Sequence, residues 1–390
     1  MRSDIKKTRL ALMADIQTGP FGSQLHKEDY VENGTPIVTV EHLGERRFAM
    51  QNLPYVSDED CIRLDKYRML EGDVVFSRVG SVDRCSYAFA ENNGWLFSGR
   101  CIRVRACREI DSLYLYYYLK SEAIKRFVRS IAVGATMPSI NTKLMGEIPL
   151  LYPSIKEQRN MVHILSVIDD KIERNIAINK NLEEQARAIF DLFYSRAVEK
   201  VPFTQLIKVL GGGTPKTTEG NFWNGDIPFF TPKDIGAPYS LRTEKYITEA
   251  GLANCNSRLY PVNTTFVTAR GTVGKVSLAG VPMAMNQSCY ALANDEIHPL
   301  LTYFYTMNTV RSLRHKATGA VFDAIITADF ERELLNKLSS DESSQVLSHI
   351  VPMMESIHKN SIGIARLSEL RDALLPRLML GELDVSSIKL

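Results

Sequence analysis

The sequence predicts an α+β protein in which two α/β domains, related by pseudo-two-fold symmetry, are separated by two long antiparallel coiled-coil helices. Three observations predict this fold. A heptad stripe of apolar residues runs from about residue 157 to residue 197, and a second stripe with the same spacing begins near residue 346. Short motifs of the first 150 residues also return, loosely, after residue 210. A stripe with a period of 3.5 residues indicates a helix that packs along a partner helix.

The first stripe contains no Pro or Gly over its length. At 1.5 Å per residue such a helix is roughly 60 Å long, and it cannot bury its stripe alone. Asn175 and Asn179 occupy two seam positions in its middle. The expected seam of the first helix consists of Met161, Leu165, Ile168, Ile172, Asn175, Leu182, Ile189 and Phe193.

The second stripe repeats the same steps, and Asn360 stands 185 positions after Asn175. Because one buried Asn in an apolar seam fixes register, we expect Asn175 and Asn360 to face each other. Pro352 and Pro376 are expected to kink this helix or to limit its regular part, and Gly363 weakens it. The expected seam of the second helix consists of Ile350, Ile357, Asn360, Ile364, Leu367, Leu374 and Leu378.

The direction in which the two helices pair follows from the distance that the connecting residues can span. Residues 199–338 connect the end of the first helix to the start of the second. A domain of that length has a radius of gyration of about 14 Å, which is far shorter than the helix. Antiparallel pairing brings the two connected ends together, so the sequence predicts an antiparallel coil.

The duplication divides the chain into two mixed domains, residues 1–152 and 199–338, and two helical segments, residues 153–198 and 339–390. Short β-like runs separated by Gly, Asn and Asp turns predict a curved antiparallel sheet in each domain. Helical patterns follow the runs at Leu113–Arg129 and Leu300–His315. Pro153-Ser154 favours a helix start, and Gly381 favours a helix stop.

The composition is ordinary for a globular protein, with 45% hydrophobic residues and a net charge of +2 among 390 residues. The six cysteines form no C-x-x-C pair, which favours reduced thiols, a cytoplasmic location and no metal site. No apolar run is long enough for a membrane helix, and Met1–Leu10 has no signal-peptide core. We therefore expect no membrane association.

Two motifs invite a catalytic interpretation. Gly211–Thr217 resembles a phosphate loop, but it lacks the full spacing and Pro215 removes an N–H donor. Asp226-Ile227-Pro228-Phe229 is similar to the Asp-Pro-Pro-Phe tetrad of amino-methyltransferases with one Pro missing, and no glycine-rich methyl-donor loop accompanies it. We therefore predict no catalytic residues and no cofactor on this chain.

Two similar domains on a rigid spacer suit a two-part target such as duplex DNA. Polar and basic residues in the loops can donate to phosphates and base edges. Arg78 and Arg270 stand close to glycines in apparent strand-end turns, which favours a DNA-binding role over that of an ordinary surface residue. The predicted DNA-binding residues are Lys27, Ser77, Arg78, Arg84, Ser139, Asn141, Lys143, Lys216, Thr217, Thr218, Lys233, Arg270 and Lys275.

Several motifs together resemble the specificity subunit of type I restriction–modification systems. Thr18–Ser23 with Gly34-Thr35-Pro36 resembles one family opening of a recognition domain, and Gly213-Thr214-Pro215 with Gly225–Pro228 resembles another. Pro153–Gln158 is similar to the family's Glu-Gln entry into the first conserved helix. The corresponding entry into the second helix, Asp341–Gln345, departs from that pattern and is expected to keep only the Gln. Leu374–Leu378 with Gly381–Asp384 resembles the usual C-terminal ending.

The resemblance implies that each domain is a target-recognition domain reading one half of a split, asymmetric site in double-stranded DNA. It implies that the helices set the spacing and dock two methyltransferase subunits, which carry S-adenosylmethionine, and that restriction subunits add ATP-dependent translocation and cleavage. Two alternatives stay open on the residues alone: a DNA methyltransferase with built-in recognition domains, and a coiled-coil scaffold that binds only proteins.

Overall fold

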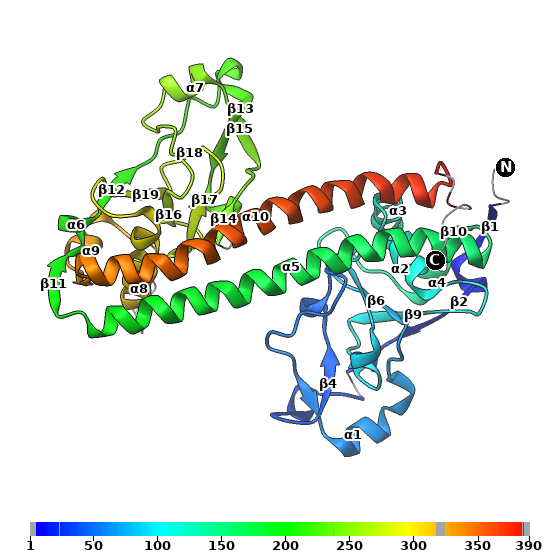
Figure 1. The fold of residues 1–390 in the computed structure, drawn as a ribbon. Coiled ribbons are helices and arrows are strands. Elements are labelled where there is room, and N and C mark those ends of the chain that lie inside the picture. Colours follow the sequence, from blue (N-terminus) through cyan, green and yellow to red (C-terminus); the bar gives the residue numbers. More distant parts are fainter. Residues whose placement is uncertain (1–4, 23, 237, 317–323, 384, 386–390) are drawn as a thin grey trace. The chain divides into compact units, whose positions relative to one another are not determined.

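The computed structural model describes residues 5–22, 24–236, 238–316, 324–383 and 385 (Figure 1). Met1–Asp4, Ser23 and Asp384, which belong to motifs considered above, lie outside these residues. The chain forms two compact units, one of residues 1–170 with 367–390 and one of residues 171–366. Each unit thus combines one mixed α/β domain with one end of each long helix.

The first unit is built on an antiparallel sheet in the order β2-β9-β6-β7. A second sheet has the order β3-β5-β4-β8, in which β4 and β8 are parallel, and β1 pairs separately with β10. The strands are β1 (Lys6–Arg9), β2 (Ala14–Thr18), β3 (Tyr30–Val31), β4 (Thr35–Val38), β5 (Tyr55–Val56), β6 (Val74–Ser77), β7 (Cys85–Tyr87), β8 (Leu96–Phe97), β9 (Cys101–Ala106) and β10 (Pro149–Tyr152).

The second unit repeats most of this topology, with a fifth strand in its main sheet and three strands in its smaller one. Its main sheet has the order β12-β19-β16-β17-β14, a smaller sheet has the order β15-β13-β18 with β13 and β18 parallel, and β11 pairs with β20. The strands are β11 (Glu199–Pro202), β12 (Lys208–Gly211), β13 (Trp223–Phe230), β14 (Tyr239–Ser240), β15 (Lys245–Ile247), β16 (Thr265–Thr268), β17 (Val276–Ala279), β18 (Ala284–Met285), β19 (Cys289–Ala293) and β20 (Leu334–Lys337). The order β2-β9-β6-β7 of the first unit recurs as β12-β19-β16-β17, which agrees with the duplication. The expectation of one antiparallel sheet per domain was wrong, because the first domain contains one parallel pair and the second contains two, β13–β18 and β14–β17.

Helices cover these sheets. The helix expected at Leu113–Arg129 is interrupted at Ser121, whose hydroxyl donates to the Tyr118 carbonyl at 2.7 Å while its own backbone is extended. The first unit has α1 (Asp58–Arg63), α2 (Ser112–Lys120), α3 (Glu122–Ile131) and α4 (Thr142–Gly146); the second has α6 (Phe203–Leu206), α7 (Glu249–Ala253), α8 (Pro299–Lys316) and α9 (Thr327–Glu331). Short 3-10 turns lie at Leu10–Leu12, Lys27–Asp29, Val40–His42, Asp65–Tyr67, Ala90–Asn92, Gly220–Phe222 and Pro232–Asp234.

The two long helices are α5 (Ile155–Arg196) and α10 (Ser340–Met379). Both begin with a capping box: Ser154 exchanges hydrogen bonds with Glu157, and Ser339 does so with Glu342. The start of α10 therefore retains the Glu of the first helix, and the expectation that it keeps only the Gln was wrong.

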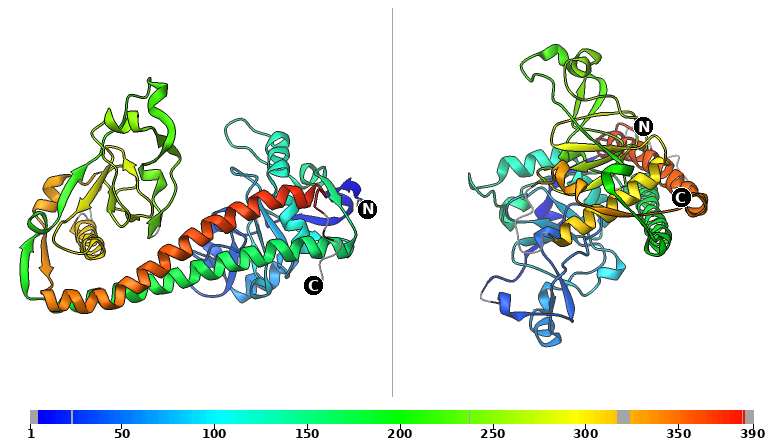
Figure 2. Two further views of the ribbon diagram at one scale, coloured as in Figure 1. Left: turned by 45° about the horizontal axis from the view of Figure 1, so that its top comes forward. Right: turned by 90° about the vertical axis from the view of Figure 1, so that its left-hand side faces the viewer.

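The helices pair antiparallel in each unit. In the first unit Arg371 on α10 donates to Asp169 on α5 at 2.9 Å. In the second unit the Asn360 amide donates to the Asn179 side chain at 2.9 Å. Later residues of α5 thus meet earlier residues of α10, as the reach of the connecting domain required, and the left view of Figure 2 shows the helices side by side. The partner expected for Asn360 was Asn175, so that expectation was wrong by one helical turn.

Near its ends, each long helix buries a wider stripe of residues than pairing with one other helix requires. Phe190 and Met354 are fully buried although neither was in the expected seam, because both also contact the second domain. The expected seam residues Met161, Leu165, Ile168, Ile172, Asn175, Ile350, Ile357 and Leu378 are buried, whereas Leu182, Ile189, Phe193, Asn360, Ile364, Leu367 and Leu374 are half-buried.

Helix α10 runs on through Pro352 and Pro376, so the prolines do not limit its regular part. Its end is set by Gly381, whose φ of +67° suits a residue without a side chain. The Gly381 N–H bonds the Leu378 carbonyl at 3.0 Å and the Glu382 N–H bonds the Arg377 carbonyl at 2.8 Å. This Schellman arrangement confirms the predicted helix stop.

Candidate nucleic-acid interface

In the second unit, three loops at strand ends surround an open pocket of about 420 Å³. The loops follow β13, β16 and β18. They contribute two of the predicted cations, Lys233 and Arg270, and Lys245 at the start of β15 adds a third. The complete lining is Thr231, Pro232, Lys233, Glu244, Lys245, Arg270, Gly271, Asn286 and Ser288. Alternating cations, hydroxyls and an amide supply the donor types that bind phosphates and base edges.

Backbone hydrogen bonds hold these three loops together. The Ala269 and Arg270 N–H groups share the Ser288 carbonyl, at 2.8 and 3.3 Å, and the Asn286 N–H bonds the Phe230 carbonyl at 2.9 Å. Gly271 has a φ of +79°, which turns the chain directly after Arg270. The pocket rim is therefore fixed by the sheet, while the long basic side chains project from it.

The Arg270 side chain is exposed and makes no hydrogen bond or ion pair within the described part of the chain. Lys233 lies 3.8 Å from Glu244 with both side chains largely in solvent, so this pair adds little stability. Lys245 lies over the Trp223 ring at 5.5 Å. Three cations thus face one carboxylate around the pocket, which favours an anionic ligand.

A glycine loop supports the same surface from below. A Cβ on Gly212 would lie 2.2 Å from the Asn286 carbonyl oxygen, so only glycine fits there. Thr214 in this loop donates to the Gln287 side chain. The Gly211–Thr217 segment therefore ends a strand and packs on the β18–β19 loop, instead of opening a helix as a phosphate loop does. Asp226–Phe229 lies within β13, which likewise gives no support to the methyltransferase interpretation.

The first unit carries a matching arrangement. A Cβ on Gly19 would lie 2.2 Å from the Ser98 carbonyl oxygen, and Gly80 has a φ of +80° directly after the β6 end. Arg78 donates to the Gly99 carbonyl at 3.1 Å and lies over the Phe21 ring at 5.4 Å. The same three structural features, a glycine loop, a strand-end turn and the loop after the parallel strand, thus meet in both units.

Several predicted residues of the first unit have structural roles. Ser77 is 1% exposed and donates to the Val79 carbonyl, so it offers no free hydroxyl, and we remove it from the proposed interface. Arg84 donates to the Leu43 carbonyl, Asn141 caps α4, and Ser139 donates to the Val133 carbonyl. For these three the assignment to DNA stays a prediction.

Five of the remaining predicted residues are exposed. Lys143, Lys216, Thr217, Thr218 and Lys275 lie in solvent, and Lys216 also accepts the Trp223 indole N–H at its carbonyl. The Lys27 side chain lies outside the described part of the structure. The sequence interpretation missed Lys245, Asn286 and Ser288. The repeat could have indicated Asn286 and Ser288. They stand three and one positions before Cys289, as Ser98 and Arg100 stand before Cys101 in the first domain.

Within the described residues, no group of three or more His, Cys, Asp and Glu side chains is placed to hold a metal ion. The helices described in this structure also include none that is long and apolar enough to span a membrane.

A duplicated pair of mixed domains, each with a basic polar surface and each packed on an antiparallel helix pair, defines a two-part recognition protein. The sequence profile of the type I restriction modification DNA specificity domain matches residues 3–184 and 196–334. The chain belongs to this family, and it is a DNA-recognition component that associates with other subunits in a type I restriction–modification complex, not the catalytic component.

Two curated relatives agree with this assignment. The chain is 24% identical over 306 residues to the specificity subunit of the type I restriction enzyme MjaIX from Methanocaldococcus jannaschii, covering 72% of this chain and 71% of the relative. It is 21% identical to the HindI specificity subunit from Haemophilus influenzae, covering 82% and 88% of the two chains. The crystal structure of a type I restriction–modification S subunit from M. genitalium has the same fold, with a TM-score of 0.62 at 15% identity over 96% of both chains.

Proposed function

We propose that each domain reads one half of a split, asymmetric duplex DNA site, the first through the Arg78 surface and the second through the Arg270 pocket. The observation that carries this assignment is the repeated geometry, in which Gly80 and Gly271 turn the chain at equivalent strand ends. In this proposal cations contact phosphates and set register, while a few side chains contact base edges. Two such surfaces on one face of B-DNA would read half-sites about one helical turn apart.

In the same proposal the long helices set the spacing between half-sites and dock two methyltransferase subunits. Those subunits carry S-adenosylmethionine, and the adenine to be methylated is flipped into their pocket. Restriction subunits join the assembly to add ATP-dependent translocation and cleavage. Support comes from the family assignment and from the continuous 42- and 40-residue helices, which offer a long exposed surface.

A domain exchange tests this division of labour. Replacing residues 1–152 with the first domain of another family member should change one half of the methylated motif and leave the other half intact. A change in both halves, or in neither, would contradict the assignment of one half-site to each domain. The wild-type chain, expressed with the same methyltransferase subunit, is the control.

A further inference from the structure

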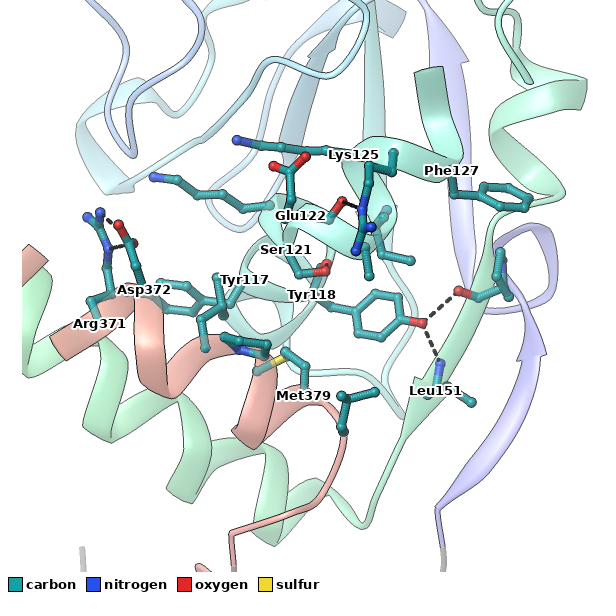
Figure 3. Close-up of a pocket in the computed structure, with 18 residues that line it drawn as sticks. Tyr117, Tyr118, Ser121, Glu122, Lys125, Phe127, Leu151, Arg371, Asp372 and Met379 are labelled. Atoms are coloured by element: carbon teal, nitrogen blue, oxygen red, sulfur yellow. Dashed lines mark hydrogen bonds and ion pairs between the residues drawn. The ribbon is translucent and has the colours of Figure 1, made fainter. Parts of the chain in front are cut away.

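The first unit contains a groove of about 840 Å³ between α2–α3 and the C-terminal third of α10. Its apolar lining includes Tyr117, Tyr118, Ile124, Phe127, Leu375 and Met379. Figure 3 shows Tyr118 and Phe127 on the α2–α3 side and Asp372 and Met379 on the α10 side. The α2–α3 pair and α10 thus form the two walls of an open apolar groove.

The charges around this groove are unbalanced. Glu122 is paired with Arg129, and Asp372 is paired with Arg371. The cations Lys120, Lys125 and Arg126, by contrast, have no carboxylate within 4 Å in the part of the chain that the structure describes. The Lys120 ammonium donates only to the Tyr116 hydroxyl at 2.9 Å, and burial lowers its pKa. A bound carboxylate would offset the hydration that the Lys120 ammonium loses on burial.

Among the described residues of the second unit, the equivalent position holds a smaller and more polar pocket. There the space measures about 310 Å³, and Thr309, Ser312 and Tyr194 replace Ile124, Phe127 and Met379. Two carboxylates interact with the donors and cations around this smaller pocket. Asp191 accepts from Asn308 at 2.8 Å and from Arg311 at 3.3 Å, and Glu333 accepts from Ser312 at 3.0 Å and pairs with Lys316. The open, cationic groove is therefore not a by-product of the repeated fold.

We propose that the groove of the first unit binds an amphipathic helix carrying Asp and Glu residues, contributed by one methyltransferase subunit. The inference rests on the proposed function, and it adds that the two methyltransferase subunits meet different surfaces on this chain. A third helix packs naturally between two helices, with apolar side chains on the floor and carboxylates beside the three cations. Duplex DNA would pair with the cations but has no apolar side chains to fill the floor.

The test is a binding titration of the full chain with its purified methyltransferase subunit, followed by native mass spectrometry. The combined substitution Lys125→Glu and Arg126→Glu lies on the solvent side of α3 and should preserve the fold. It should weaken one of the two binding steps by about tenfold or more and leave the other step unchanged. Leu380→Asp, at a 55% exposed groove residue, should weaken the same step. The matched control is Arg311→Glu, at the position equivalent to Arg126, which should leave the step affected by the groove variants unchanged.

Unchanged binding by both groove variants, or equal weakening of both steps, would overturn the groove assignment while leaving the proposed function intact. If the wild-type chain bound no methyltransferase subunit at all, the proposed function would fail, and the groove assignment with it.

Discussion

The amide of Asn360 donates a hydrogen bond of 2.9 Å to the side-chain oxygen of Asn179, joining the two long helices in the second unit. Asn179 in turn donates to the Ser361 hydroxyl at 3.3 Å and approaches the Ile357 carbonyl at 3.5 Å. The pair is therefore satisfied within the seam, which is the condition under which a polar residue specifies register without a large cost in stability.

Asn360→Leu should lower the thermal unfolding midpoint, because it leaves the Asn179 oxygen unpaired at a cost of about 1–2 kcal/mol. The double variant Asn179→Leu with Asn360→Leu should recover most of that loss, because two apolar residues of similar size then meet. Calorimetry of the four chains of this double-mutant cycle measures the coupling. Additive effects of the two substitutions would show that the observed hydrogen bond does not contribute.

The alignment of the helices illustrates what the sequence could and could not predict. The heptad stripes and the offset of 185 positions identified both helices, their pairing and their direction. The offset states that Asn175 and Asn360 are equivalent, but equivalence does not state which residues face each other across the pair. That choice depends on how far one helix is shifted along the other within the second unit, where Asn179 lies opposite Asn360, one turn from Asn175.

Arg270→Ala should weaken recognition of the second half-site by about 1–3 kcal/mol if the guanidinium contacts a base. The measurement is competition binding of the reconstituted methyltransferase complex to duplexes that vary in one half-site at a time. Lys208→Ala, which removes an exposed cation paired with Asp295 outside the pocket, is the matched control and should have no effect. Equal weakening on every sequence would make Arg270 a phosphate contact.

Gly19→Ala should impair the first half-site and Gly212→Ala the second, because each new Cβ would meet a carbonyl oxygen at 2.2 Å and displace the loop that supports the surface. Gly22→Ala is the control in the same loop as Gly19, since a Cβ there has no atom within 4 Å. Methylation of test plasmids with either half-site altered reports the outcome. Loss of both half-sites in either variant would indicate general unfolding.

Cys101 and Cys289 should resist alkylation in the native protein. Burial raises the pKa of both thiols to about 12, so at pH 8 the reactive thiolate is scarce at either site. Cys107 and Cys255 are partly exposed and should react first. Mass spectrometry after a timed pulse of iodoacetamide gives the order in which the cysteines are alkylated. Early modification of Cys101 would contradict the burial of β9, the strand that it begins.

The candidate interface was only partly predictable, and the reason is physical. Arg78 and Arg270 could be proposed from the sequence because a glycine turn beside a strand end is a local signal. Lys245 lies on β15 and reaches the pocket only through pairing with β13, which no local pattern shows. The burial of Ser77 was not predictable, because a strand-end hydroxyl and an exposed loop hydroxyl look alike in sequence, whereas in the structure Ser77 is buried and donates to the Val79 carbonyl.

The most direct measurement of the central claim is sequencing of methylated bases in cells that express this chain with its methyltransferase subunit, compared with cells that lack the chain. We predict one new methylated motif with two short defined halves separated by an unspecified spacer. Arg270→Ala should alter or relax only one of these halves. A continuous motif without a spacer, or the same methylation with and without the chain, would contradict recognition by two separate domains.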